Sequence, residues 1–212
     1  MPRPDFVDAL VADLEPVRPA APWLHVMLAW CLVSWIIVGG AILASGPLRA
    51  GIVSELMGSP RFALELALGF AAGLAAIWAG LELGVPGAPS GPRLWTPPLL
   101  LFGAWTLAVG YELIDPSGPP RIDGMRVHCF METLLVSLPP YTMALFFLRG
   151  RIAYAQTRTG LLVGAAAAAI PALWMHVACR AEPTHVLSFH LPPILIIGAL
   201  GALVAHRVLP RV

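Results

Sequence analysis

The sequence has little charge and no lysine. Only 12% of its 212 residues are charged, whereas a soluble domain carries about 25%, and all of its positive charge comes from arginine. The formal net charge of +1 provides no strongly basic surface, so we expect no nucleic-acid partner. The three cysteines include no Cys-x-x-Cys pair, which disfavours a membrane thiol oxidoreductase, and we expect a protein that is not an enzyme.

Apolar residues make up 58% of the chain and gather in long runs. A membrane helix needs roughly 20 apolar residues, and the segments that qualify are 24–44, 62–82, 95–114, 130–149, 159–178 and 189–208. Backbone polar groups inside a lipid bilayer must be satisfied within the helix. We therefore expect an all-α polytopic membrane protein, with a tail over residues 1–22 and six transmembrane helices with short loops over residues 23–212.

The arginines indicate an orientation. Six spans put both termini on one side, which carries eight arginines against five on the other. Because positive residues favour the cytoplasmic side, we expect a multi-pass protein of a bacterial inner membrane, with the N- and C-termini cytoplasmic. The loops 45–61, 115–128 and 179–188 would then face the periplasm.

Two of the cysteines lie at helix ends that should meet. Cys129 opens the fourth predicted helix, 21 residues before Gly150, and Cys179 closes the fifth, 21 residues after Arg158. At 1.5 Å per residue, each lies about 31 Å from the short connection between these helices, so both reach the same depth. Helices pack about 8–10 Å apart, which allows a disulfide between facing cysteines. A permanent disulfide and a dithiol that responds to oxidants or metals both fit this spacing, and the boundary position predicts thiols that oxidants can reach.

Histidines surround these cysteines in the sequence. His128 adjoins Cys129, His176 lies three residues before Cys179 and therefore on the same helix face, and His185 and His190 follow. Two thiols with two or more imidazoles suit a soft divalent metal such as zinc. The alternative is that these histidines bond loop backbone. We expect no obligatory cofactor, and a metal-binding or metal-transporting membrane protein is the alternative function.

The N-terminal tail has an amphipathic pattern. Phe6, Leu10 and Leu14 recur every four residues, which predicts an apolar helical stripe, and Pro16 ends the helix. The tail is acidic, and an acidic helix is repelled by an anionic membrane surface. It therefore suits a groove on a partner protein better, and a helix this short would fold on that partner. The alternative is a solvated leader.

Carboxylates and prolines inside the spans give two more predictions. Glu65, Glu82, Glu112 and Glu132 lie near predicted helix ends, so we expect them at the membrane interface, which disfavours a transporter. Pro139–Pro140 and Pro171 interrupt the fourth and fifth helices and are candidate hinges.

Several stretches carry a family resemblance: "CFMETLLVSLPP" from Cys129, Gly160 and Gly164, Cys179, "THVLSFHLPP", "GALGALVAHRVLP" and the tail "LVADLEPVRP". In these the chain resembles the NrsF-type membrane anti-sigma factors. The resemblance implies six helices that hold a cytoplasmic segment, and this segment sequesters an extracytoplasmic-function sigma factor. It also implies that Cys129 and Cys179 sense oxidative or heavy-metal stress. The sigma-binding residues it implies are Leu10, Asp13, Leu14, Pro16 and Val17, beside Phe6 of the same stripe.

Overall fold

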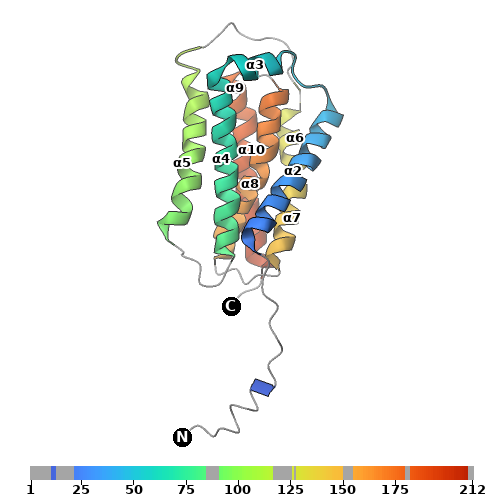
Figure 1. Cartoon of the computed structure of the whole chain (residues 1–212), viewed down its shortest axis with the longest axis vertical. Coiled ribbons are helices and arrows are strands. Elements are labelled where there is room, and N and C mark those ends of the chain that lie inside the picture. Colours follow the sequence, from blue (N-terminus) through green and yellow to red (C-terminus); the bar gives the residue numbers. More distant parts are fainter. Residues whose placement is uncertain are drawn as a thin grey trace.

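The computed structural model describes residues 11–12, 22–84, 91–116, 126, 128–149, 155–179 and 182–209. Within these ranges the chain forms helices and no strand, and the helices pack into one elongated bundle (Figure 1). The all-α prediction is therefore confirmed. The predicted partner-binding residues lie outside the described residues: Phe6, Leu10, Asp13, Leu14, Pro16 and Val17.

The long helices run alternately up and down the bundle. In chain order the elements are α2 (Trp23–Ser45), α3 (Ile52–Gly58), α4 (Pro60–Leu83), α5 (Pro92–Tyr111), α6 (Cys129–Val136), α7 (Leu138–Arg149), α8 (Gln156–Ala178), α9 (Pro183–His185), η1 (Val186–His190) and α10 (Leu191–Val208). The start of α2 and the end of α10 lie together at one end of the bundle, here called the proximal end (Figure 1). The opposite end, which carries α3 and α9, is called the distal end.

Among the described residues, five helical segments are long and apolar enough to cross a membrane: Trp23–Ser45, Pro60–Leu83, Cys129–Arg149, Gln156–Ala178 and Pro183–Val208. They coincide with five of the six predicted spans. The remaining predicted span, 95–114, corresponds to α5, whose 20 residues include Pro97 and Pro98. Helix α5 is not among the five segments, so the prediction of six spans is not confirmed. The short helix α3, within the predicted loop 45–61, was not anticipated.

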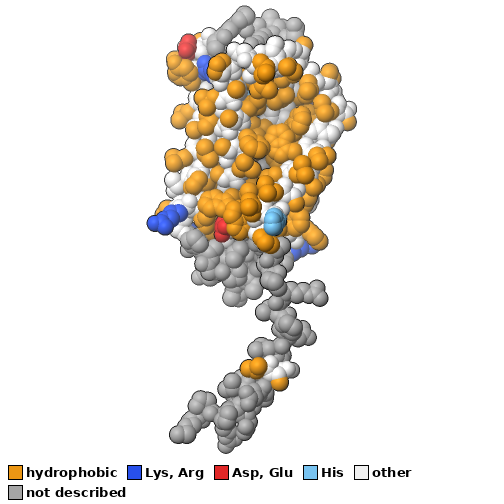
Figure 2. Space-filling view, in the orientation of Figure 1, with side chains coloured by type: hydrophobic (Ala, Val, Ile, Leu, Met, Phe, Trp, Pro, Cys, Tyr) orange, Lys and Arg blue, Asp and Glu red, His pale blue; other side chains and the backbone are white. Residues whose placement is uncertain are grey.

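Helix α8 is the centre of the bundle. In its most apolar 18-residue stretch, 78% of the residues are buried, whereas the same stretch of the other four candidate spans is 28–44% buried. Helix α8 packs most extensively against α10 and α4. Small residues allow this approach: a Cβ added at Gly160 would collide with the carbonyl oxygen of Gly201 on α10. The outer helices instead expose large apolar side chains (Figure 2). This is the surface expected of a bundle surrounded by lipid.

The two proline sites differ in their effect on the helices. Proline has no N–H to donate, so Pro139 and Pro140 leave gaps in the helical hydrogen bonding, and the helix is divided into α6 and α7 at Ser137. In contrast, α8 continues through Pro171. The indole N–H of Trp30 on α2 donates to the carbonyl oxygen of Pro140, at 2.8 Å, and so ties α2 to α7 beside the break.

Candidate thiol and histidine site

Cys129 and Cys179 meet at the distal end of the bundle. Cys129 is the first residue of α6 and Cys179 directly follows α8. Their Sγ atoms lie 3.0 Å apart, although 50 positions separate them in sequence, and both are free thiols. The predicted juxtaposition is thus confirmed. The predicted accessibility is wrong: Cys129 is 2% exposed and Cys179 is 0% exposed, because both sulfurs are enclosed where α6, α8 and η1 come together.

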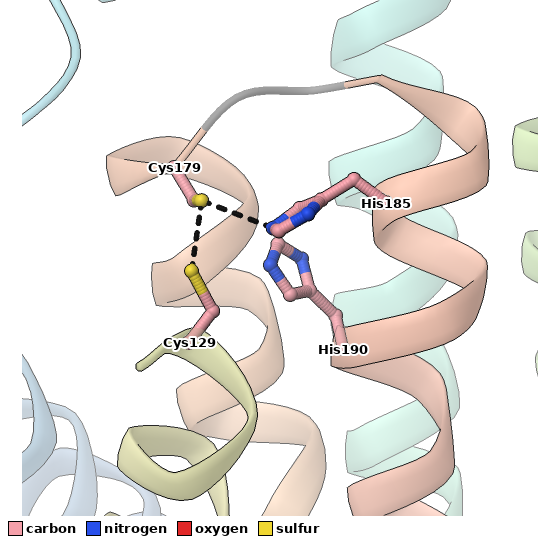
Figure 3. A group of neighbouring side chains, drawn as sticks. All are labelled: Cys129, Cys179, His185 and His190. Atoms are coloured by element: carbon pink, nitrogen blue, oxygen red, sulfur yellow. Dashed lines mark hydrogen bonds between the residues drawn. The ribbon is translucent and has the colours of Figure 1, made fainter. Parts of the chain in front are cut away.

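His185 and His190 complete this group from a third segment. Nε2 of His185 lies 3.2 Å from Sγ of Cys179, and the rings of His185 and His190 meet edge to face at 5.1 Å. The four side chains point toward one another (Figure 3). One donor atom from each, two sulfurs and two nitrogens, all lie within 4.8 Å of one another. We call these four residues the Cys2His2 cluster.

A π-helical turn places the two histidines together. Five residues span about 1.4 turns of an α-helix, so His185 and His190 would point in different directions on one. Here η1 is a π-helix, in which the backbone N–H of Leu191 donates to the carbonyl oxygen of Val186, five residues earlier. This wider turn brings both imidazoles to one side, and such turns occur frequently at functional sites. The sequence spacing alone did not reveal it.

The other two candidate histidines are not members of the cluster, although the ring of His176 meets that of His190 edge to face at 6.5 Å. His128, although adjacent to Cys129 in sequence, is exposed just before α6. His176 is buried, and its Nε2 lies 3.1 Å from Oε2 of Glu65 on α4. A stacked ring contact with Phe62, at 5.3 Å, holds the imidazole in this position. His176 therefore joins a neighbouring polar network.

That network surrounds Glu65. Its carboxylate lies 3.6 Å from Nε of Arg61, one turn earlier on α4, and Arg61 also approaches Glu112 at the end of α5, at 3.9 Å. Glu65 is near its helix end, as predicted, but it is only 3% exposed. A buried carboxylate is costly without partners, and Arg61 with His176 provides them. Sequence analysis did not identify this pairing because the partners are 111 positions apart.

Arg126 connects the thiols to α2. Its guanidinium donates to the carbonyl oxygens of Ile42, Gly46 and Pro47 at the end of α2, at 2.6–3.2 Å, and pairs with Glu132 at 3.2 Å. The backbone carbonyl of Arg126 lies 2.9 Å from Sγ of Cys129. Carbonyls at a helix C-terminus lack intrahelical partners and favour a cation. The position of Arg126, three residues before the cysteine that begins α6, could have indicated from the sequence that an arginine lies beside the thiols.

The two thiols are not equivalent. The hydrogen bond shared with Cys129 lowers the pKa of Cys179; burial raises that pKa, and the hydrogen bond shared with His185 lowers it further, so that the net shift is downward. Hydrogen bonding to the charged form favours that form. The surroundings of Cys179 therefore favour its thiolate form.

Comparison with known proteins places these features in a family context. The family model described as NrsF, negative regulator of sigma F, matches residues 10–210. A stretch of 96 residues is 30% identical to the carotenogenesis protein CarR of Myxococcus xanthus, and it covers 45% of this chain and 42% of that protein. The chain thus matches less than half the length of this relative. No solved structure matches the chain.

Proposed function

Since this chain belongs to the NrsF family of negative regulators of sigma F, we propose that it is a membrane anti-sigma factor. In this proposal the tail of residues 1–22 holds an extracytoplasmic-function sigma factor. Oxidative or heavy-metal stress acts on Cys129 and Cys179 and releases it. The protein performs no catalytic step.

The proposed topology has six spans in a bacterial inner membrane, with α5 as the third. At 1.5 Å per residue, the 20 residues of α5 extend about 30 Å, the thickness of the hydrocarbon layer, and α5 packs beside α4. The arginine distribution favours cytoplasmic termini. The proximal end then faces the cytoplasm and the Cys2His2 cluster lies on the periplasmic side, where disulfides persist.

The proposed switching step is oxidation of the thiol pair. With a peroxide as oxidant, one bond forms between the two sulfurs, the O–O bond of hydrogen peroxide breaks, and the two thiol hydrogens leave in two water molecules. Cys179 is the sulfur that attacks first, because Nε2 of His185 lies 3.2 Å from it and can take up its proton. Because both sulfurs are buried, a local opening of the distal end must precede this reaction.

The observation that carries the proposal is the connection from Cys129 through Arg126 to α2. Helix α2 directly follows the tail. It is the least buried of the candidate spans, since 28% of its most apolar 18-residue stretch lies buried inside the bundle. A change at Cys129 moves the Arg126 carbonyl, and the Arg126 side chain holds the distal end of α2. Displacement of α2 would alter the position of the tail at the proximal end.

Co-purification tests the sequestration. The full chain should retain its sigma factor in detergent, whereas a chain without residues 1–22 should not. A triple substitution Phe6→Ala, Leu10→Ala and Leu14→Ala should also lose the partner. A triple substitution on the exposed face of α5, Leu99→Ala, Leu100→Ala and Leu107→Ala, serves as the control. Undiminished capture by the truncated chain would refute the proposal.

Cysteine substitutions test the release. Cys129→Ser and Cys179→Ser should each abolish peroxide-dependent release of the sigma factor from the purified complex, and Cys31→Ser should leave it unchanged. Release from the serine variants at the wild-type rate would mean that the thiols have only a structural role. Metal transport, the alternative function, predicts metal uptake into vesicles that contain the protein, and an anti-sigma factor predicts none.

A further inference from the structure

The Cys2His2 cluster has the composition of a closed metal site. Its donors come from α6, from the end of α8 and from the α9–η1 turn, and all four residues are buried. Two thiolates and two imidazoles are ligands that zinc prefers, whereas calcium and magnesium prefer oxygen. Four protein ligands leave no open position, which is typical of zinc sites that hold a fold together.

The distances require only small adjustments. Zinc binds sulfur at about 2.3 Å and imidazole nitrogen at about 2.0–2.1 Å, so two thiolate ligands of a tetrahedral ion lie about 3.8 Å apart. The sulfurs of Cys129 and Cys179 are 3.0 Å apart, and every donor pair lies within 4.8 Å. The two sulfurs would move apart by less than about 1 Å to bind one ion.

His190 provides an independent observation. It is 0% exposed, and neither of its ring nitrogens has a hydrogen-bond partner among the described residues. A buried polar group without a partner destabilises a fold. Its side chain points into the cluster (Figure 3), and a metal ion there would supply the missing partner.

Charge also favours a divalent ion. Two thiolates, two neutral imidazoles and one Zn²⁺ sum to zero, so the loaded site buries no net charge. Binding displaces up to two thiol protons to solvent. The π-turn is consistent with this use because it brings His185 and His190 to one side, facing both sulfurs.

We propose that Cys129, Cys179, His185 and His190 bind one Zn²⁺ ion in a closed tetrahedral site that joins α6, α8 and η1. Binding does not depend on the proposed anti-sigma function. One consequence does rest on that function: zinc occupies the sulfurs that must form the disulfide, so the loaded site holds the protein in the sigma-binding state.

The test uses the full chain in detergent, stripped of metal by a chelator under reducing conditions. Zn²⁺ titration should give one bound ion per chain, and Co²⁺ should give the visible bands of a tetrahedral ion with thiolate-to-cobalt charge transfer in the near ultraviolet. His185→Ala, His190→Ala, Cys129→Ser and Cys179→Ser should each weaken Zn²⁺ binding at least about 100-fold, since loss of even an outer-shell partner costs about 10–100-fold. His128→Ala and Cys31→Ser are matched controls and should bind as the wild type does.

Thermal unfolding distinguishes variants that lose Zn²⁺ binding because a metal ligand is missing from variants that lose it because they no longer fold. Metal-free His190→Ala loses no hydrogen bond among the described residues, but it leaves a cavity at a fully buried position. Its unfolding temperature should fall below that of metal-free wild type, and Zn²⁺ should no longer raise it. If His190→Ala does not fold, His190→Gln replaces it. Wild-type protein without bound Zn²⁺, an octahedral Co²⁺ spectrum, or undiminished binding by a His185→Ala/His190→Ala double variant would each overturn the site. Sigma capture by the metal-free chain is measured separately, so failure of the metal site and failure of the anti-sigma function give different results.

Discussion

The guanidinium of Arg126 donates a 2.6 Å hydrogen bond to the carbonyl oxygen of Gly46, the residue that directly follows α2. The same arginine contacts Cys129 through its backbone carbonyl. One residue therefore joins the thiol pair to the helix that follows the tail. This arrangement gives the anti-sigma proposal a route through the bundle that substitutions can test.

Arg126→Ala should separate sensing from release. The substitution leaves helix-end carbonyls of α2 without a cation, and loss of hydrogen bonds to a charged group costs about 1.5–3 kcal/mol. We expect a lower free energy of unfolding and, in the sigma complex, disulfide formation that no longer releases the partner. Arg207→Ala, an exposed arginine at the proximal end, is the control. Wild-type release by Arg126→Ala would exclude this route.

The buried pair of Glu65 and His176 should show energetic coupling. Their side chains are 4% and 1% exposed and 3.1 Å apart, and residues in contact typically couple by about 0.5–3 kcal/mol. A double-mutant cycle with Glu65→Gln and His176→Ala, measured by unfolding in mixed micelles, gives this energy. Repeating the cycle with Glu82→Gln, at the other end of α4, should give additive effects.

The contact between α8 and α10 should tolerate no added carbon at Gly160. A Cβ there would collide with Gly201 and Ala205, whereas a Cβ at Gly103 on α5 would meet nothing within 4 Å. Gly160→Ala should lower the free energy of unfolding by about 1–3 kcal/mol, the usual cost of overpacking. Gly103→Ala makes the same chemical change and should not destabilise the bundle. Equal stability of the two variants would contradict the close approach.

Zinc should protect the thiols from oxidation. The ion and the disulfide compete for the same two sulfurs, so metal-free protein treated with peroxide should form the Cys129–Cys179 disulfide much faster than zinc-loaded protein. Mass spectrometry follows the loss of two hydrogens, and a chelator should restore the fast rate. In metal-free Cys31→Ser the reaction should be unchanged, because Cys31 lies in α2 away from the pair. Equal oxidation rates with and without zinc would show that the ion binds elsewhere.

Helix positions followed from the sequence because apolar runs of the required length leave few alternatives. The predicted segment 159–178 corresponds to α8, Gln156–Ala178, and 24–44 corresponds to α2, Trp23–Ser45. The meeting of Cys129 and Cys179 also followed, from equal distances to one short connection. Prediction was weaker where composition is ambiguous, as at 95–114, where Pro97 and Pro98 interrupt the apolar run.

The sequence by itself determined a helical chain with apolar spans and a thiol pair at one depth, because helix rise and apolar run length are local properties. Only the tertiary structure decided which histidines join the thiols. His185 and His190 reach them through the π-turn, while His176 turns to Glu65 on α4. The position of Arg126 at the end of α2 was decided in the same way. These contacts depend on side-chain direction between distant segments, and residue spacing along one chain does not contain that information.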